Sequence, residues 1–312
     1  MSTPSRLTLR IATRSSALAL WQAEHVAARI AEVAPDVATE IIHITTTGDR
    51  DQTGSLRSFG GLGVFTREVQ KAVLDGRADL AVHSLKDLPT DPTPGLELAA
   101  IPQREETADA LVLPTGFGGP GELAALPHGA KIGTGSLRRR AQLLHLRPDL
   151  VLEEARGNVD TRLRKLDSGE FDALILAAAG LKRLGLASRI SSRLVPPVMF
   201  AAVGQGALGI ESREGDEPTR EVLSRLDDRA TRFRVTAERS LLNRLRAGCH
   251  APVGVESRVV GSELNLEGVV LSPDGRQRIK SEGNAPDEIA AGLGQRVADQ
   301  LLALGAAALI GG

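Results

Sequence analysis

Short apolar segments alternate with amphipathic segments along more than half of the chain. Residues 7–12 alternate as a strand does, and a run with helical periodicity begins near Ser15 and Ser16 and ends before Pro35. The same alternation predicts further strands at 38–44, 78–83, 131–133, 150–154 and 173–177, and further helices at 65–74, 137–146 and 159–166. Strands that alternate with helices form mainly parallel sheets with helices on both faces. The sequence therefore predicts an α/β fold for this part of the chain.

The pattern changes in the last third of the chain. After Gly215, a long helical periodicity over 228–246 precedes three strand patterns and a closing helix, at 253–256, 264–271, 278–281 and 286–304. This order predicts a separate α+β domain. Earlier in the chain, the segment 96–107 and the proline-marked stretch 194–197 are candidate boundaries. Because 312 residues exceed what one hydrophobic core usually organises, we expect two or three domains.

The composition argues against several classes of partner. The net charge is −1 at pH 7, so no overall field attracts nucleic acid or a membrane surface. One tryptophan, six phenylalanines and no tyrosine leave few side chains that stack on bases. The 38 basic residues are 32 arginines and 6 lysines, which suits bidentate binding of carboxylates or phosphates. Codon bias also explains such a ratio, so only local clusters of arginine are informative.

The chain has one cysteine, Cys249, which excludes an intrachain disulfide and a zinc site built from cysteines. The first ten residues lack the apolar run of a signal peptide, and no stretch of about 18 apolar residues occurs. We therefore expect a cytoplasmic protein with no membrane association. The six histidines are scattered without ligand spacing, which disfavours a metal site.

A first candidate anion site lies where the strand 131–133 gives way to a helix. Thr134 or Ser136 can cap this helix, whose unpaired N–H groups would face an anion together with Arg138 and Arg139. A capped helix with a solvated basic turn is the alternative. Residues 131–165 contain nine basic and four acidic residues, so the local excess of positive charge favours a polyanionic ligand. The later basic residues of this segment are Arg156, Arg162, Arg164 and Lys165.

Two more segments follow a predicted strand with polar residues. In 10–16, Arg14 and Ser16 repeat the anion-site pattern, although an ordinary capping serine with a solvated arginine explains them equally well. In 83–89, Lys86 and Asp87 stand just past the C-terminal end of a strand, where ligands bind in open α/β sheets. Asp87 is therefore a candidate proton donor or counter-ion to a cationic intermediate, and a surface ion pair is the alternative.

Cys249 lies in a loop between a long helix and a strand, flanked by Gly248 and Pro252. This setting favours a thiol that is accessible to a ligand, whereas most free cysteines are buried as small apolar residues. A helix C-terminus raises the pKa of a thiol, so activation would need a cation such as Arg244 or Arg246, or the bound partner. A catalytic pair of Cys249 with His250 is disfavoured, because neighbours on an extended chain point apart.

Two glycine-rich motifs carry no nucleotide-binding prediction. The G-x-G-x-x-G match at 204–209 is not followed by a sustained helix. The segment 60–63 lacks the Lys-Ser/Thr ending of a phosphate-binding loop, and we interpret it as part of a mobile flap.

Taken in order, eight segments of the chain resemble the porphobilinogen deaminase family: RIATRSSALALWQA, ADLAVHSLKDLP, IGTGSLRRRAQL, RGNVDTRLRKL, AAAGLKRLGL, VGQGALGIE, RVTAERSLLNRL and GCHAPVG. The resemblance implies two periplasmic-binding-protein-like, doubly wound α/β domains and a C-terminal α+β domain, with the chain returning to the first domain near Val203. The implied limits are 1–102 with 200–221 for domain 1, 103–199 for domain 2 and 222–312 for domain 3.

The resemblance also implies an activity and a cofactor. Such an enzyme joins four porphobilinogen molecules head to tail, loses ammonia at each addition and releases hydroxymethylbilane. The chain grows on a dipyrromethane that Cys249 holds through a thioether. Each pyrrole bears an acetate and a propionate, so the local arginines would supply charge-assisted hydrogen bonds to a growing polycarboxylate.

Roles transfer by position. Asp87 matches the catalytic carboxylate, which assists ammonia loss and stabilises the cation that forms. The positions that match cofactor-binding residues are Lys86, Asp87, Thr134, Ser136, Arg138, Arg139 and Arg162. The positions that match substrate-binding residues are Arg14, Ser16, Phe65, Arg156 and Arg183. Two positions depart from the family pattern: Leu62 often is lysine, and Gly135 often is serine.

A small-anion solute-binding protein is the alternative function, because two α/β domains with anion sites would serve it equally well. A solute-binding protein would not need a third domain with an exposed thiol. A nucleic-acid-binding protein ranks third, because stacking aromatics are scarce. For the enzyme we expect a monomer that binds porphobilinogen and hands its product to the next enzyme of the pathway.

Overall fold

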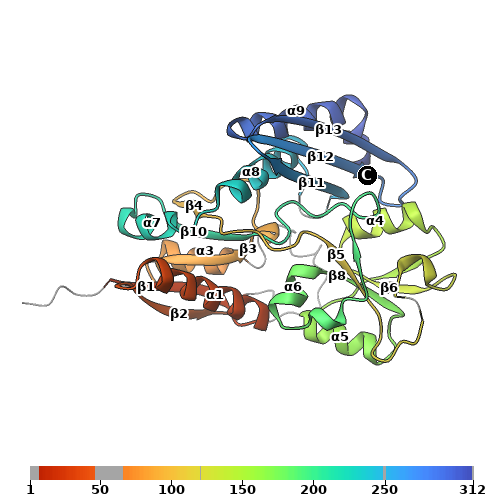
Figure 1. Cartoon of the computed structure of the whole chain (residues 1–312), viewed down its shortest axis with the longest axis horizontal. Helices are drawn as coiled ribbons and strands as arrows, with labels where there is room; N and C mark the ends of the chain where they lie inside the picture. Colours follow the sequence, from red (N-terminus) through yellow and green to blue (C-terminus); the bar gives the residue numbers. More distant parts are fainter. Residues whose placement is uncertain (1–6, 46–65, 120, 249–250, 311–312) are drawn as a thin grey trace, which may run out of the picture. The chain divides into compact units, whose positions relative to one another are not determined.

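The computed structural model describes residues 7–45, 66–119, 121–248 and 251–310. The chain divides into two compact units, Met1–Arg104 with Ala207–Arg232, and Glu105–Gly206 with Phe233–Gly312. Each unit therefore combines two separated stretches of the chain (Figure 1). None of the helices in these described ranges is long and apolar enough to span a bilayer.

A five-stranded mixed sheet forms the first unit. Its strands are β1 (Thr8–Arg14), β2 (Ala38–Ile44), β3 (Leu80–Ser84), β4 (Leu96–Ala100) and β10 (Leu208–Arg213), and its helices are α1 (Ala17–Val33), α3 (Arg67–Leu74) and α7 (Glu217–Ser224). The strand order is β2-β1-β3-β10-β4. β1 runs parallel to β2 and β3, whereas β10 is antiparallel to both of its neighbours.

Helices cover both faces of this sheet because neighbouring side chains of each strand point to opposite sides. On one face, α1 and α7 bury Ile30 and Leu223 in a cluster with Leu9 of β1. On the other face, α3 buries Val69 in a cluster with Ala12 of β1. The predicted covering of the sheet on both faces is confirmed for this unit.

The second unit contains a sheet with the same plan. Its strands are β5 (Asp109–Val112), β6 (Lys131–Gly133), β7 (Val151–Glu153), β8 (Ala173–Ala177) and β9 (Ser192–Leu194), and its helices are α4 (Leu137–Leu146), α5 (Val159–Asp167) and α6 (Ala178–Arg183). The order is β7-β6-β8-β5-β9, with β6 parallel to β7 and β8 and with β5 antiparallel to its neighbours. Leu143 of α4 and Leu166 of α5 belong to two separate buried clusters.

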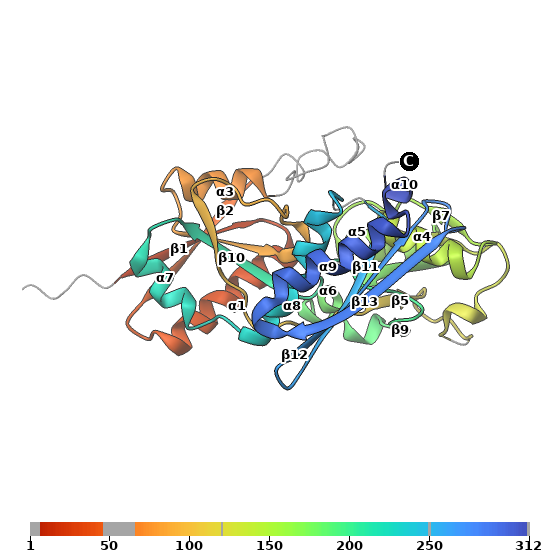
Figure 2. The ribbon, with the colours of Figure 1, turned by 90° about the horizontal axis from the view of Figure 1, so that it is seen from above.

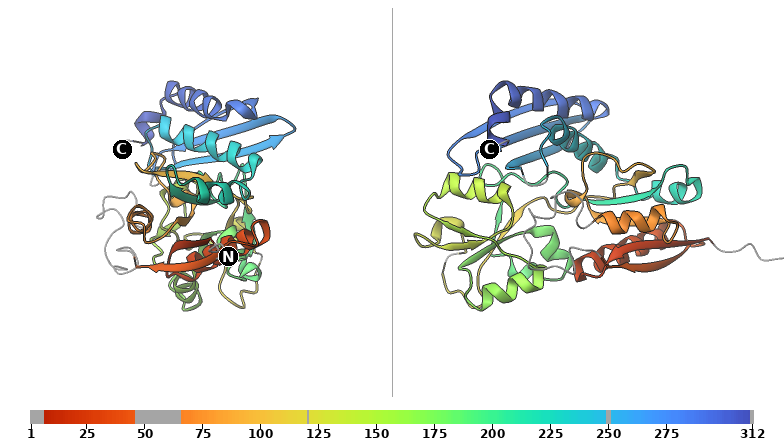
Figure 3. Two further views of the ribbon diagram at one scale, coloured as in Figure 1. Left: turned by 90° about the vertical axis from the view of Figure 1, so that its left-hand side faces the viewer. Right: turned by 180° about the vertical axis from the view of Figure 1, so that it is seen from behind.

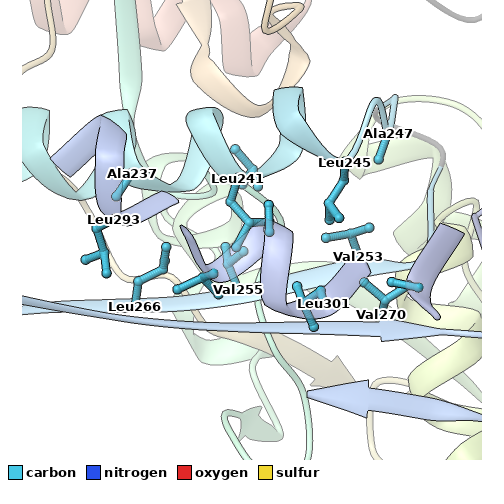
Figure 4. Close-up of a cluster of buried hydrophobic side chains, with 14 of the residues drawn as sticks. Ala237, Leu241, Leu245, Ala247, Val253, Val255, Leu266, Val270, Leu293 and Leu301 are labelled. Carbon is cyan, nitrogen blue, oxygen red and sulfur yellow. The ribbon is translucent and has the colours of Figure 1, made fainter. Parts of the chain in front are cut away.

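The same unit ends in a three-stranded antiparallel sheet. This part consists of α8 (Arg229–Arg244), which begins in the first unit, then β11 (Val253–Val260), β12 (Glu263–Leu271), β13 (Arg278–Pro286), α9 (Ala290–Ala303) and α10 (Ala306–Ile310). α9 lies along one face of the sheet (Figures 2 and 3). Leu241 of α8 and Leu293 and Leu301 of α9 bury their side chains against Val255 and Leu266 of the strands (Figure 4). On the other face, Val269 and Leu271 pack with Phe200 and Ala141.

Several predicted elements coincide with the observed ones, including β2, β6, α4 and β8. Mainly parallel α/β sheets and a C-terminal α+β part are confirmed, with one antiparallel strand in each large sheet. The elements that the sequence analysis missed are β4, β5, β9, β10, α6, α7 and α10. β4 lies inside the segment 96–107 that we expected to be a boundary. The predicted limits of the three domains stay a prediction.

We predict that Gly294→Ala lowers the free energy of unfolding by about 1–3 kcal/mol, the usual effect of overpacking. A β-carbon on Gly294 would overlap the Ala237 carbonyl oxygen of α8 and lie 2.9 Å from the Leu241 nitrogen. Gly292→Ala is the matched control on the same helix, because nothing lies within 4 Å of its added carbon. That variant should be neutral or slightly stabilising. Urea unfolding measures both; equal stability of the two variants would contradict the predicted helix contact.

Candidate functional site

Both units carry residues that the sequence analysis assigned to the site. The first unit holds Arg14, Ser16, Lys86 and Asp87, and the second holds Thr134, Ser136, Arg138, Arg139, Arg156, Arg162 and Arg183. Phe65, Cys249 and Leu62 lie outside the described residues.

In the first unit, two neighbouring parallel strands bring the assigned residues to one edge of the sheet. Arg14 is the last residue of β1, and Lys86 and Asp87 follow β3 directly in a short 3-10 helix, Leu85–Asp87. β1 and β3 are paired in parallel, so their carboxyl ends meet at the same edge. Lys86 is half-buried and Asp87 is exposed. This is the sheet edge at which α/β proteins bind ligands.

The backbone around Asp87 is held from two sides. The Leu85 N–H donates to the Ala207 carbonyl at 3.0 Å, and the Leu85 side chain is buried. One residue earlier, the Ser84 hydroxyl accepts a 2.8 Å hydrogen bond from the buried Gln22 amide of α1. These contacts fix the backbone where the chain passes from β3 to Asp87. A fixed backbone suits a carboxylate that must be held in one position.

Ser16 is the N-cap of α1, and its hydroxyl accepts from the Ala19 N–H at 3.4 Å. The capping interpretation is therefore confirmed for Ser16. Because β1 ends at Arg14 and Ser16 caps α1, the N-terminus of this helix also lies at this edge of the sheet.

A buried polar cluster that the sequence analysis missed lies behind this edge. His83 of β3 places its Nε2 atom 3.1 Å from Glu211 Oε2 on the neighbouring strand β10. The Gln70 amide of α3 donates to both Glu211 oxygens, at 2.9 and 3.1 Å. All three side chains are buried. The cluster ties α3 to the strand that leads into Asp87.

In the second unit, the strand-to-helix turn after β6 has the geometry of an anion site. Ser136 is the N-cap of α4, with its hydroxyl 3.4 Å from the Arg139 N–H. The buried Thr134 hydroxyl accepts from the Ser136 N–H at 3.3 Å. A β-carbon on Gly135 would make only an ordinary 3.6 Å contact. Position 135 therefore has room for a β-carbon, although this chain has glycine there. Both predicted capping residues therefore shape the start of α4.

Arg138 and Arg139 are buried, with 3% and 6% of their surface exposed. Both pair with Asp109 of β5: Arg138 Nη1 lies 2.8 Å from Oδ2, and Arg139 Nε and Nη2 lie 3.0 and 2.7 Å from Oδ1. Burial by itself raises the pKa of Asp109, but the two guanidinium charges outweigh it and hold the pKa well below its usual range. The alternative of a solvated basic turn does not describe these two arginines.

The cluster keeps capacity for an anion. Two guanidinium groups face one carboxylate, which leaves one positive charge among these three side chains. Burial lowers the pKa of Arg138, and Asp109 opposes that shift. Within the described part of the chain, Arg138 Nε is buried and has no hydrogen-bond partner. A carboxylate that reached this N–H would satisfy it and neutralise the remaining charge.

The three remaining assigned arginines contact other parts of the unit. Arg156 pairs with Glu154 at 2.9 Å, and Arg162 Nε donates to the Gly157 carbonyl at 2.8 Å. Arg183 is mostly enclosed, which lowers its pKa, and it donates to the Gly206 carbonyl at 2.7 Å.

The residues that flank Cys249 are anchored in the C-terminal core. α8 ends in a Schellman motif: Ala247 N–H donates to the Leu242 carbonyl, and Arg246 takes a φ of 50°. Leu245 and Ala247 then lie in the same buried cluster as Val253 (Figure 4).

Between these anchors, Gly248 is exposed, and its carbonyl accepts from the Ala251 N–H at 3.0 Å. Arg244, one of the two cations considered for thiol activation, already pairs with Asp299 at 2.7 Å. The described residues on both sides of Cys249 are thus fixed by the C-terminal core.

Two family models match the chain in succession. The model "Porphobilinogen deaminase, dipyromethane cofactor binding domain" matches residues 9–221, and "Porphobilinogen deaminase, C-terminal domain" matches residues 232–303. The porphobilinogen deaminase of Acidithiobacillus ferrooxidans is 49% identical over 302 residues, 97% of each chain. That of Syntrophotalea carbinolica is 48% identical over 298 residues, 96% of this chain and 93% of the relative. Among solved structures, the methionine-binding protein MetQ has a TM-score of 0.45 and 12% identity, over 70% of this chain and 89% of its own.

We predict that Ser136→Ala lowers the free energy of unfolding by about 1 kcal/mol, because α4 loses its N-cap. Ser136→Asp should keep the stability of the native chain, since aspartate caps a helix as well as serine does. Ser168→Ala, at the exposed C-terminal end of α5, is the control and should change little. Urea unfolding of the three variants checks this; equal losses for Ala and Asp at position 136 would refute the capping role.

Proposed function

The chain belongs to the porphobilinogen deaminase family, and we propose that it joins four porphobilinogen molecules head to tail on a dipyrromethane held by Cys249. Ammonia leaves at each addition, and the product released is hydroxymethylbilane, in the biosynthesis of tetrapyrroles. One observation carries the proposal: the cofactor-binding and C-terminal family domains match consecutive parts of the chain, 9–221 and 232–303. The C-terminal match also favours this enzyme over a small-anion solute-binding protein.

The residues of the second unit fit a polycarboxylate cofactor. The supporting features are the unsatisfied Arg138 N–H, the surplus positive charge beside Asp109 and the capped start of α4 at Ser136. We propose that the cofactor is held by Lys86, Asp87, Thr134, Ser136, Arg138, Arg139 and Arg162. The dipyrromethane, when bound, supplies the pyrrole carbon to which the first substrate unit is joined.

The acids of the incoming porphobilinogen need separate partners. We assign them to Arg14, Ser16, Arg156 and Arg183, with Phe65 as an aromatic neighbour of the substrate. Charge-assisted hydrogen bonds contribute about 1.5–3 kcal/mol each, so a few of them hold a small dicarboxylate in place. An ion pair with a solvent-exposed arginine contributes less to binding. Arg183 is mostly enclosed, so it is the strongest of these candidates.

Asp87 is the candidate catalytic residue. It is exposed at the C-terminal edge of its sheet, on a backbone held by the Leu85 hydrogen bond. Loss of ammonia leaves a positive charge on the substrate's methylene-pyrrole, and a carboxylate beside the pyrrole N–H stabilises that charge as it develops. The role depends on the negative charge of Asp87, which an amide of the same shape lacks.

We also propose that the enzyme is a cytoplasmic monomer and passes hydroxymethylbilane to the next enzyme of the pathway. A monomer is sufficient because each proposed role is assigned to a residue of one chain. Light scattering of the purified protein at micromolar concentration measures the mass directly.

We predict that the purified protein carries an adduct of two pyrrole units on Cys249. Its intact mass should exceed that of the polypeptide by two porphobilinogen molecules less two ammonia molecules. Cys249→Ala is the control and should give the bare polypeptide. A preparation that turns over porphobilinogen and yet shows only the bare mass would overturn the covalent attachment.

We predict that Asp87→Asn keeps this adduct but lowers turnover by about a hundredfold or more, as loss of a charge-stabilising group does. Asp75→Asn, which removes an exposed carboxylate paired with Lys71, is the control and should retain full turnover. Steady-state assays with porphobilinogen compare the two variants. Full activity of Asp87→Asn would remove Asp87 from the mechanism.

A further inference from the structure

Asp109 is the centre of a buried polar cluster that joins three separate parts of the second unit. It is 1% exposed and lies on β5, the antiparallel strand of the sheet. Its oxygens face Arg138 and Arg139 of α4, and its Oδ1 also accepts from the Gln205 amide at 3.0 Å. Gln205 is itself buried, and its amide donates to the Thr107 carbonyl at 2.8 Å as well. The carboxylate is therefore fixed in position before any ligand arrives.

The arginines gain further contacts that leave them little freedom. Arg139 Nη1 donates to the Ile175 carbonyl of β8 at 3.0 Å. Arg138 Nη1 donates to the Phe200 carbonyl, which also accepts from the Gln142 amide at 3.0 Å. Each guanidinium is thus held by Asp109 on one side and by a backbone carbonyl on another. Of the Arg138 nitrogens, Nε is the buried one that has no partner in the described ranges.

The arrangement around Asp109 differs from that around Asp79, another carboxylate that holds two arginines. In the first unit, Asp79 pairs with Arg10 at 2.8 Å and with Arg213 at 3.1 Å. Arg213 also pairs with Asp216 at 2.7 Å, so two carboxylates balance two guanidinium groups there. The Asp109 cluster has two guanidinium groups and one carboxylate, together with an unsatisfied N–H. Of the two clusters, only the one around Asp109 has charge and a donor left for an anionic ligand.

We propose that Asp109 is a positioning residue that holds the Arg138 and Arg139 guanidinium groups in the orientation in which they bind carboxylates of the dipyrromethane. The proposal rests on the proposed function, because it names the ligand of that site. Asp109 does not touch the ligand; it acts through the two arginines. Because the guanidinium groups are already oriented, ligand binding loses less conformational entropy than it would with mobile side chains.

The test measures how fast the apo-protein acquires its two pyrrole units. Apo-protein is incubated with increasing porphobilinogen, and intact mass gives the fraction that carries the adduct at each time. The half-saturating concentration and the maximal rate are then obtained separately. Native chain should acquire the adduct; if it does not, the proposed function fails whatever Asp109 does.

Asp109→Asn should raise the half-saturating concentration about tenfold or more, as loss of charge-assisted contacts does. Asp79→Asn is the matched control, because it removes a carboxylate that holds two arginines outside the site. It should load within about twofold of the native chain, because the two arginines that Asp79 holds are not assigned to the cofactor. If Asp109→Asn loads as well as Asp79→Asn, Asp109 has only a structural role and the proposal is overturned.

A second variant decides the matter if Asp109→Asn gives no folded protein. Asp109→Glu keeps the charge but lengthens the side chain by one methylene group, which displaces the guanidinium groups. We expect it to load several times more slowly than Asp79→Glu, since orientation matters for bidentate contacts. Loading at the native rate would overturn the proposal.

Discussion

Two guanidinium groups that share one buried carboxylate are the central constraint of the candidate site. Burial of a charge is strongly unfavourable unless a partner compensates it, and Asp109 provides that partner for Arg138 and Arg139. The compensation is incomplete by one positive charge. In the proposed site, a carboxylate of the ligand would complete this charge balance, whereas a neutral or cationic group would not. This charge balance supports the proposal that the second unit binds an acidic pyrrole chain.

The two α/β sheets have the same topology, and this topology determines where the candidate site residues lie. In each sheet, the second strand in order leads into a helix whose first turn is capped by a serine, Ser16 after β1 and Ser136 after β6. The third strand in order, β3 or β8, leads into Asp87 or into the short helix that ends at Arg183. The proposed ligand contacts thus lie where parallel strands end.

Local patterns in the sequence predicted much of this arrangement. The caps at Ser16 and Ser136 and the position of Asp87 after a strand follow from short-range rules, and the structure has them. The burial of Arg138 had a signal as well, since it lies on the same helical stripe as Ala141.

The sequence did not predict the buried polar clusters of Asp109, His83 and Glu211, because the members of each cluster lie far apart in the sequence. Asp109 contacts Arg139 at a separation of 30 residues and Gln205 at 96, and Gln70 contacts Glu211 at 141. A polar residue in a short apolar run gives no indication of which distant side chain will compensate it. Strands β5 and β10 were not predicted either. Each contains a buried carboxylate, which interrupts the apolar pattern that marks a buried strand.

A crystal structure of the purified protein with its adduct would show whether Arg138 and Arg139 bind the pyrrole carboxylates. We expect electron density that continues from the Cys249 sulfur into two pyrrole rings, with a carboxylate oxygen within about 3 Å of Arg138 Nε. Asp109 should still contact both arginines in that structure. Pyrrole carboxylates that face solvent, with Arg138 Nε left without a ligand oxygen, would contradict the proposed cofactor site.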